Sequence, residues 1–319
     1  TNDCSICILS PKMAECARHP SIALHTYSEV QEVGGAAGNF RVRVRRYARY
    51  VKEDECTGCG ECAEKCPTRV PDEFDMGLRL RKAIYQYYLQ GVPPAMTIDS
   101  QHCLQLTRGR CGICQKVCQR GAIDYEEQDQ DLELEVGAIV LATGLDPGDA
   151  SAAKQYGYGR YRNVITALEY ERLISASGPT GGHLLRPSDQ QPVKRLAFLQ
   201  CVGSRDPAHD RGYCSSVCCM YATKEAILAH EHDREVRSTI FYTDLRAAGK
   251  GFQEYVDRAK REYGATYVRT RAAEIALDGD ERPVVRYEDT ESGRVGSEAV
   301  DLAVLATALV PRRDNGRLA

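Results

Sequence analysis

One short run of cysteines constrains this chain more than any other feature. The run has the spacing C-x₂-C-x₂-C-x₃-C and is followed directly by a proline: Cys56, Cys59, Cys62, Cys66 and Pro67. Three thiols at intervals of three residues can meet at one centre only if the chain turns tightly between them. Gly58 and Gly60 supply the backbone freedom that such a loop needs. The stretch is therefore expected to wrap around a group bound by thiolates.

This spacing is the ligand run of bacterial iron–sulfur ferredoxins, in which the fourth cysteine binds the other of two clusters. A second run must then exist, and the chain has four further cysteines that can form it: Cys103, Cys111, Cys114 and Cys118. We predict that cluster one is bound by the first three thiols and the last: Cys56, Cys59, Cys62 and Cys118. We predict that cluster two is bound by the remaining four: Cys66, Cys103, Cys111 and Cys114.

The second run departs from the ferredoxin pattern, because seven residues separate Cys103 from Cys111 and Gln119 stands where a proline would be. Neither difference removes a ligand. A structural zinc site is an alternative, but zinc usually takes two C-x-x-C pairs rather than two overlapping runs of four. A disulfide framework is a second alternative. A chain of 319 residues can build a core without covalent cross-links, so this alternative fits less well.

Length, charge and cysteine content limit the class of protein. A length of 319 residues allows two or three domains. The 42 Lys and Arg residues against 45 Asp and Glu leave a net charge of −3, which gives no electrostatic case for nucleic acid or an anionic membrane. The longest apolar run, 136–145, is too short for a transmembrane segment. Fifteen cysteines without a signal peptide indicate metal binding in a reducing, cytoplasmic setting.

Two apolar segments indicate α/β sheets. Residues 136–145 form a continuous apolar run bounded by glycines, which predicts a strand covered on both faces. Residues 136–147 match residues 300–311 at seven of twelve positions, so we expect two related sheet domains, each closing on an equivalent strand. The tripeptide Ala142-Thr143-Gly144 resembles the segment that passes the flavin in flavoproteins built from two dinucleotide-binding domains.

A strand–helix–strand unit lies between these segments, with strands predicted at 195–201 and 236–242 and a helix at 215–231. A nucleotide-binding unit would place a glycine-rich turn after its first strand. Here cysteines stand at the turn and the helix start: Cys201, Cys214, Cys218 and Cys219. We predict a third iron–sulfur cluster at these four thiols, favoured by the helix dipole. Only Cys214 and Cys218 would share a helix face, so a redox-active dithiol or buried structural cysteines remain alternatives.

Three further cysteines precede the first run. Cys4 and Cys7 form a pair but not a full ligand set. Cys16 is expected to be a small, buried, apolar residue. The sequence begins at Thr1 without a methionine, and we expect both ends to be truncated.

Several longer segments resemble one family. They include residues 4–13, residues 51–67, residues 200–206 and residues 213–226, the last containing Cys218-Cys219-Met220-Tyr221-Ala222-Thr223-Lys224-Glu225-Ala226. Over nearly its whole length the chain is similar to the A subunits of heterodisulfide reductases and their homologues. That resemblance implies a thioredoxin-reductase-like flavoprotein with an inserted two-cluster ferredoxin domain. It also implies FAD, a [4Fe–4S] cluster at the late cysteines, and Lys224 and Glu171 close to the flavin ring.

The expected domain organisation follows from the resemblance. Residues 1–50 and 128–170 would belong to the FAD-binding domain, 51–127 to the inserted ferredoxin domain, and 171–319 to a second Rossmann-like domain whose nucleotide site is replaced by cysteines. The glycine-rich FAD fingerprint that should precede Thr1 is absent from the sequence. The chain is therefore expected to need further residues to hold FAD.

The functional hypothesis is an oxidoreductase component that moves electrons between [4Fe–4S] clusters and FAD. The resemblance implies electron bifurcation in several family members. It also implies partners, among them heterodisulfide reductase B- and C-like subunits, hydrogenase- or formate-dehydrogenase-linked subunits, and ferredoxin. Two alternatives stay open: a ferredoxin-like relay or docking subunit without flavin, and an NAD(P)H-dependent disulfide reductase.

Overall fold

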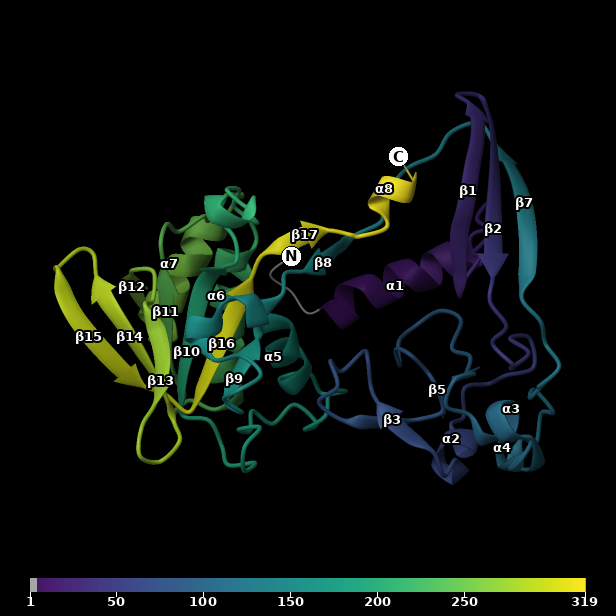
Figure 1. The fold of residues 1–319 in the computed structure, drawn as a ribbon, viewed down its shortest axis with the longest axis horizontal. Coiled ribbons are helices and arrows are strands. Elements are labelled where there is room, and N and C mark those ends of the chain that lie inside the picture. Colours follow the sequence, from purple (N-terminus) through teal and green to yellow (C-terminus); the bar gives the residue numbers. More distant parts are fainter. Residues whose placement is uncertain (1–4, 319) are drawn as a thin grey trace. The chain divides into compact units, whose positions relative to one another are not determined.

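A computed structural model describes residues 5–318 of the chain and the side chains of residues 8–316. The chain forms two compact units, one spanning Gly144–Arg313 and the other spanning Asp3–Thr143 with the residues from Asp314 onward. Figure 1 shows the helices and strands of both units. Among the described residues, no helix has the length and apolar character needed to cross a lipid bilayer.

The first unit is built on a parallel five-stranded sheet in the order β12-β11-β10-β16-β9. Its strands are β9 (Val164–Thr166), β10 (Arg195–Val202), β11 (Arg237–Tyr242), β12 (Thr266–Arg269) and β16 (Leu302–Thr307). Every residue of β16 is buried, as is β10 after its first residue. Continuous apolar strands of this kind are typical of a sheet that is covered on both faces.

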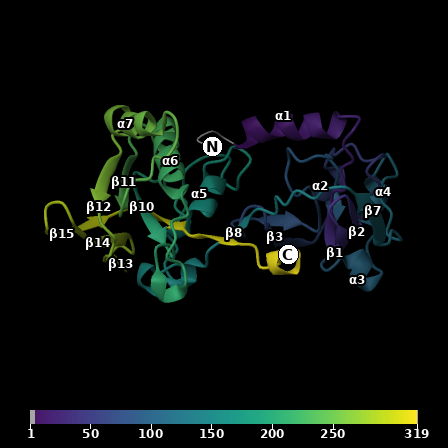
Figure 2. The ribbon, with the colours of Figure 1, turned by 90° about the horizontal axis from the view of Figure 1, so that it is seen from above.

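Helices cover one face of this sheet and a second sheet covers the other (Figure 2). The helices are α5 (Ala167–Leu173), α6 (Cys218–His232) and α7 (Phe252–Glu262). The second sheet is antiparallel, with β13 (Glu274–Leu277), β14 (Pro283–Asp289) and β15 (Arg294–Ala299). Ala197 and Leu199 of β10 pack in one core with Ile275 and Val285 of this second sheet. The α/β prediction is confirmed, and the predicted strand–helix–strand unit corresponds to β10, α6 and β11.

Shorter elements complete the first unit. Strand β8 (Leu145–Pro147) pairs antiparallel with β17 (Leu309–Pro311). Three short 3₁₀ helices are η1 (Ala150–Ala152), η2 (Lys154–Tyr156) and η3 (Pro207–His209).

A capping box starts α5, the helix that carries Glu171. The Thr166 hydroxyl accepts a hydrogen bond from the Glu169 backbone N–H at 3.3 Å, and the Glu169 carboxylate accepts one from the Thr166 backbone N–H at 2.6 Å. The substitution Thr166→Ala removes one half of this box and is expected to lower the free energy of unfolding by about 1 kcal/mol. Chemical denaturation measures the loss. The variant Glu169→Gln keeps the box, so an equal loss in both variants would contradict this explanation.

The second unit contains an antiparallel sheet and the segment with the first two cysteine runs. The sheet has the order β1-β2-β7, formed by β1 (Ser28–Ala36), β2 (Asn39–Arg46) and β7 (Gln130–Val136). Short elements make up most of the rest: α2 (Glu61–Lys65), β3 (Arg69–Pro71), β4 (Leu80–Lys82), β5 (Ile84–Tyr85), β6 (Thr97–Ile98), α3 (Leu104–Arg108) and α4 (Ile113–Val117). Helices α1 (Ser5–Arg18) and α8 (Asn315–Leu318) lie towards the two ends of the described chain. The segment has its own small core around Val51, Ile84 and Ile98, which also includes several cysteines.

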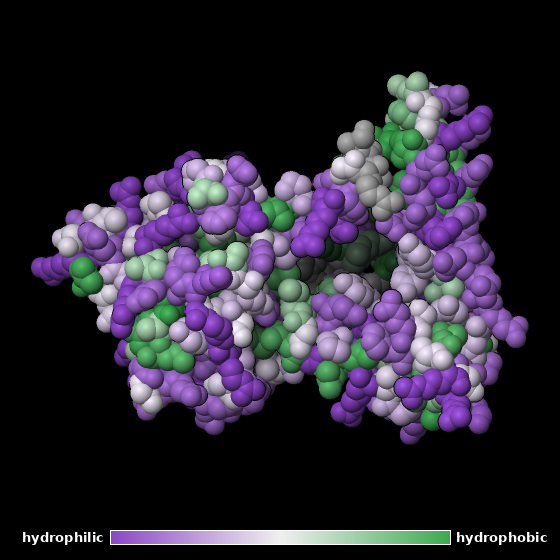
Figure 3. All heavy atoms as spheres, viewed as in Figure 1, coloured by the Kyte–Doolittle hydropathy of each residue, from purple (hydrophilic) through white to green (hydrophobic). Residues whose placement is uncertain are grey.

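Two predictions about this unit are wrong. The apolar run at 136–145 is not a buried strand, because β7 ends at Val136 and residues 137–144 are exposed and irregular, with Val140 90% exposed. No described strand pairs with residues 137–144; instead most of them line a hollow with Val33 of β1 and Phe40 of β2. Figure 3 shows hydrophobic side chains at the surface around β1 and this segment. Cys16 is exposed rather than buried, because its face of α1 is not covered by the described residues.

Candidate metal centres

Four thiols surround one small cavity in the second unit. The cavity is lined by the four cysteines predicted for cluster two, Cys66, Cys103, Cys111 and Cys114, together with apolar side chains and Tyr125. Short helices position them: Cys66 ends α2, Cys103 precedes α3, and Cys114 lies in α4. The structure therefore brings together the thiols that the sequence assigned to one cluster, although they come from two separate cysteine runs.

Burial dominates the electrostatics of this cavity. It raises the pKa of the Cys114 thiol, and a hydrogen bond between Cys114 Sγ and the Tyr125 hydroxyl at 2.9 Å acts in the opposite direction. A buried thiol ionises readily only next to positive charge such as a metal ion. In this segment the tyrosine hydroxyl is placed to donate to a metal-bound sulfur.

Of the cysteines predicted for cluster one, Cys56 and Cys59 lie in the loop before α2, Cys62 lies in α2 and Cys118 ends α4. The two helices pack against each other. Burial raises the pKa of the Cys62 thiol to about 12. The Met96 backbone N–H points at Cys56 Sγ (3.5 Å), and the Ala122 backbone N–H points at Cys118 Sγ (3.4 Å). Such donors stabilise negative charge on cluster sulfurs.

One glycine of this loop has no room for a side chain. Gly58 has a φ of 68°, and a Cβ atom there would clash with the carbonyl oxygen of Pro94. The loop between Cys56 and Cys59 can therefore close only with glycine at this position.

The late cysteines converge in the first unit, by a route that the sequence did not predict. Helix α6 begins at Cys218 rather than Ser215, so Cys214 lies in the preceding loop and shares no helix face with Cys218. Cys201 is buried one residue before the end of β10 and has a φ of 61°. Because Cys214 is free of helical geometry, it can approach the other three thiols. The prediction that Cys214 and Cys218 share a face of one helix is therefore wrong.

The late thiols lie near enough to one another to affect each other's ionisation. Burial raises the pKa of Cys218 to about 11, a hydrogen bond to Tyr221 opposes it, and the neighbouring thiols Cys201, Cys219 and Cys214 raise it further. The positively charged Arg205 side chain also lies near these thiols. Burial likewise raises the pKa of Cys201, and the Arg205 guanidinium lowers it.

Arg205 fits a site for a negatively charged group. It is held by Asp244 at 2.6 Å, and its Nη1 atom is buried without a hydrogen-bond partner. The Ser216 backbone N–H points at Cys214 Sγ, 3.4 Å away. Four thiols, a guanidinium and a backbone donor are a donor set that suits an iron–sulfur cluster.

The arrangement differs from a mononuclear metal site and from a disulfide framework. Within residues 8–316, no three His, Cys, Asp or Glu side chains are placed to hold a single metal ion. Thiolates bound to one zinc ion lie about 2.3 Å from it, whereas a four-iron cluster holds each thiolate at a separate corner. All thirteen cysteines whose side chains are described are free thiols. Cys4 and the Cys7 side chain lie outside that part of the chain.

Lys224 and Glu171 form an ion pair between α6 and α5. The Lys224 side chain is buried and that of Glu171 is 33% exposed. Sequence reasoning missed their neighbour Glu225, whose side chain is completely buried. The available signal was a pair of adjacent charged residues inside the otherwise apolar helix 218–229, where most side chains are buried and both charges cannot reach solvent.

A family model described as a 4Fe-4S binding domain matches residues 49–72. The chain is 52% identical to the second iron–sulfur A subunit of the CoB–CoM heterodisulfide reductase of Methanopyrus kandleri, over 98% of this chain and 47% of the relative. It is 48% identical to the corresponding iron–sulfur A subunit of Methanocaldococcus jannaschii, over 100% of this chain and 48% of the relative. This chain belongs to the heterodisulfide reductase A-subunit family. The resemblance inferred from the sequence is confirmed.

A third member of the family is the A subunit of the H₂/formate:CoB–CoM heterodisulfide, ferredoxin reductase of Methanococcus maripaludis, 47% identical over 100% of this chain and 48% of that protein. The chain thus spans about half the length of the curated family members it matches. Among solved structures, it shows partial likeness to Lactococcus lactis thioredoxin reductase, with a TM-score of 0.34, 15% identity, and coverage of 72% of this chain and 65% of that one.

The three residues predicted to lie beside a flavin, Ala142, Thr143 and Gly144, are exposed. Gly144 has open space where a Cβ atom would be. Ala142 and Thr143 line a hollow of about 590 Å³ together with apolar side chains of β1 and β2, among them Val33 and Phe40, and the flavin contact of the three residues stays a prediction.

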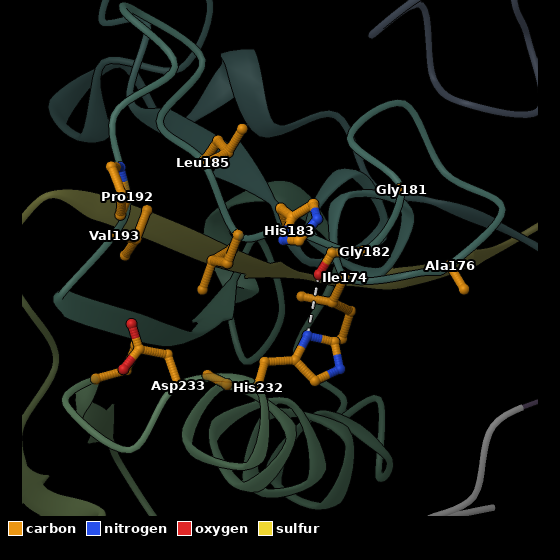
Figure 4. Close-up of a pocket in the computed structure, with 13 residues that line it drawn as sticks. Ile174, Ala176, Gly181, Gly182, His183, Leu185, Pro192, Val193, His232 and Asp233 are labelled. Carbon is orange, nitrogen blue, oxygen red and sulfur yellow. Dashed lines mark hydrogen bonds between the residues drawn. The ribbon is translucent and has the colours of Figure 1, made fainter.

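A separate pocket in the first unit involves none of the predicted site residues. It has a volume of about 590 Å³ and lies between the chain after α5 and the end of α6 (Figure 4). His232 Nδ1 donates to the Gly182 carbonyl at 3.0 Å across this pocket. That histidine therefore fastens the end of α6 to a loop.

Proposed function

We propose that this chain is the electron-transferring part of a heterodisulfide-reductase-type oxidoreductase. One observation carries the proposal: the structure gathers four thiols from two distant cysteine runs around a single cavity, next to the residues that match a 4Fe-4S binding domain. A [4Fe–4S] cluster accepts and releases one electron at a time.

The proposed ligands follow the sequence assignment. Cluster one is held by Cys56, Cys59, Cys62 and Cys118, cluster two by Cys66, Cys103, Cys111 and Cys114, and a third cluster by Cys201, Cys214, Cys218 and Cys219. The surroundings support each set. The backbone donors to Cys56 and Cys118, the Tyr125 hydroxyl at Cys114 and the Arg205 guanidinium near Cys201 all favour negative charge on sulfur.

FAD is proposed as the further cofactor of the whole protein, with Lys224 and Glu171 close to its ring. The support is family membership. An ammonium group and a carboxylate beside a redox cofactor shift its potential in opposite directions. Because Ala142, Thr143 and Gly144 are exposed in the described part of the chain, a flavin-free relay subunit is the second candidate.

Partners and location are proposed on the names of relatives. The name of the Methanococcus maripaludis protein includes H₂, formate, heterodisulfide and ferredoxin. We therefore infer a multi-subunit complex that exchanges electrons with hydrogenase- or formate-dehydrogenase-linked subunits, B- and C-like subunits and ferredoxin, with electron bifurcation as the inferred mode. The free thiols favour a reducing, cytoplasmic location.

The proposed domain organisation keeps residues 51–127 as a ferredoxin insert between 1–50 and 128–170, followed by 171–319. Pairing of β2 with β7 supports the insertion, because it joins the chain before the insert to the chain after it in one sheet. The compact units divide after Thr143, so β9 and α5 pack with the sheet of the first unit.

Anaerobic quantitation of iron, acid-labile sulfide and flavin in the full-length protein tests the function. Three [4Fe–4S] clusters would give about twelve irons and about twelve sulfides per chain. One FAD per chain supports the flavoprotein, and none favours the relay. About eight irons would remove the late-cysteine cluster. Zinc in place of iron would refute electron transfer, and direct oxidation of NADH would favour a disulfide reductase.

A further inference from the structure

A buried carboxyl group, that of Glu225, lies beside the Lys224–Glu171 ion pair. Glu225 has an exposed fraction of 0%, and neither of its carboxyl oxygens receives a hydrogen bond from an N–H or hydroxyl group. The Glu171 carboxyl group lies within hydrogen-bonding reach of it. Two neighbouring carboxylates repel each other and cannot hydrogen-bond, so the arrangement favours a proton on one of the two groups.

The groups that face Glu225 come from α5 and from its own helix. Tyr170 of α5 is fully buried, but its hydroxyl donates to the Glu225 backbone carbonyl at 3.3 Å rather than to the carboxyl group. Tyr221 lies one turn earlier on α6 and is partly buried. Lys224 points its ammonium group at Glu171. Within residues 8–316, Glu171 and Lys224 are the charged side chains that shift the pKa of the Glu225 carboxyl group.

This environment decides which carboxyl group holds the proton. Glu171 is 33% exposed and accepts from the Lys224 ammonium group, so its charge is compensated. Glu225 has neither solvent nor a cation of its own, and an isolated buried carboxylate is strongly disfavoured. Burial, followed by the negative charge of Glu171, raises the pKa of Glu225 well above its usual range.

We propose that Glu225 is a buried proton-holding residue that donates a hydrogen bond to Glu171 and so positions the Glu171–Lys224 pair. Glu171 then accepts from Lys224 and from Glu225. The three side chains together carry no net charge: +1 from Lys224, −1 from Glu171 and zero from Glu225.

The position of Glu225 connects this cluster to the late cysteines. Glu225 lies seven residues after Cys218, which places both on the same face of α6, about 10 Å apart along the helix axis. Charges interact strongly over such distances in a buried region. A neutral cluster therefore adds no net charge beside the late-cysteine site. The functional meaning of this neutrality rests on the proposed electron transfer. The inference that Glu225 carries a proton does not depend on it.

Infrared spectroscopy of the full-length protein tests the proton directly. At pH 7 the wild type is expected to show a carbonyl band of a protonated carboxylic acid that shifts in D₂O and disappears in Glu225→Gln. The variant Glu262→Gln changes an exposed carboxylate on α7 and is expected to keep the band. In Glu171→Gln the band is expected to remain at a shifted frequency. A wild type without the band at pH 7, or a band that survives in Glu225→Gln, would overturn the proposal.

The pH dependence of stability is a second, independent readout. A glutamic acid in the unfolded chain ionises above about pH 4.3, whereas folded Glu225 keeps its proton. Unfolding then releases a proton, so the wild type loses stability as the pH rises above that value. The glutamine side chain of the Glu225→Gln variant has no proton to release.

The denaturation midpoint of Glu225→Gln relative to wild type is therefore expected to increase steadily from pH 5 to pH 8. A difference that stays constant over this range would count against the proposal. Neither readout needs iron or flavin, so failure here is distinguishable from failure of the proposed function.

Discussion

Replacing Cys218 by alanine is expected to lower the iron content of the full-length protein by about four atoms per chain, roughly a third of the total. Cys218 is buried at the first turn of α6, where its thiol lies close to Cys201, Cys214 and Cys219. A four-iron cluster that loses one of four thiolates in a buried site, where water does not readily take its place, is expected to be lost. Iron and acid-labile sulfide, measured anaerobically, should fall together.

Two companion variants make this result specific. Cys16→Ala removes an exposed thiol on α1 and is expected to leave iron unchanged. Cys114→Ala removes a thiol from the cavity of the second cysteine set and is expected to cause a loss of equal size. Electron paramagnetic resonance of the reduced proteins should then lack a different signal in each variant. Full iron in Cys218→Ala, with an unchanged spectrum, would assign the late cysteines a structural role.

Replacing Lys224 by methionine is expected to lower the free energy of unfolding by about 2–3 kcal/mol. The substitution keeps the length and apolar contacts of the side chain but leaves Glu171 without its cation, next to the buried Glu225. Breaking a buried ion pair from one side costs about 3–5 kcal/mol, and the partial exposure of Glu171 reduces that cost. Chemical denaturation under anaerobic conditions measures the change.

The double variant Lys224→Met with Glu171→Gln separates pair loss from packing loss. Removing both charges is expected to recover most of the stability, because no uncompensated carboxylate remains. Lys250→Met is the matched control: Lys250 is exposed, and its replacement is expected to change stability by less than about 0.5 kcal/mol. A double variant no more stable than Lys224→Met would show that the ammonium group acts through contacts other than Glu171.

Local spacing predicts the early cysteine sites, and the structure gathers four of these thiols around one cavity. Cys56, Cys59 and Cys62 lie close together in sequence, and Gly58 gives the loop between them the positive φ that a tight turn needs. The strands β10 and β11 and the helix between them were also predictable, because a strand buried on both faces must be apolar along its whole length. Family membership followed from long matching segments.

Tertiary structure decided the features that depend on what covers a segment. The apolar runs 137–144 and 302–307 look alike in sequence, but only the second has neighbouring strands, so one is exposed and the other forms the buried strand β16. The place of Cys214 depended on where α6 begins. Glu225 is buried because α5 packs over its side of α6, and no periodicity in the helix itself records that contact. Residue spacing encodes contacts between near neighbours in the chain, whereas burial of a given side chain depends on elements far away in sequence.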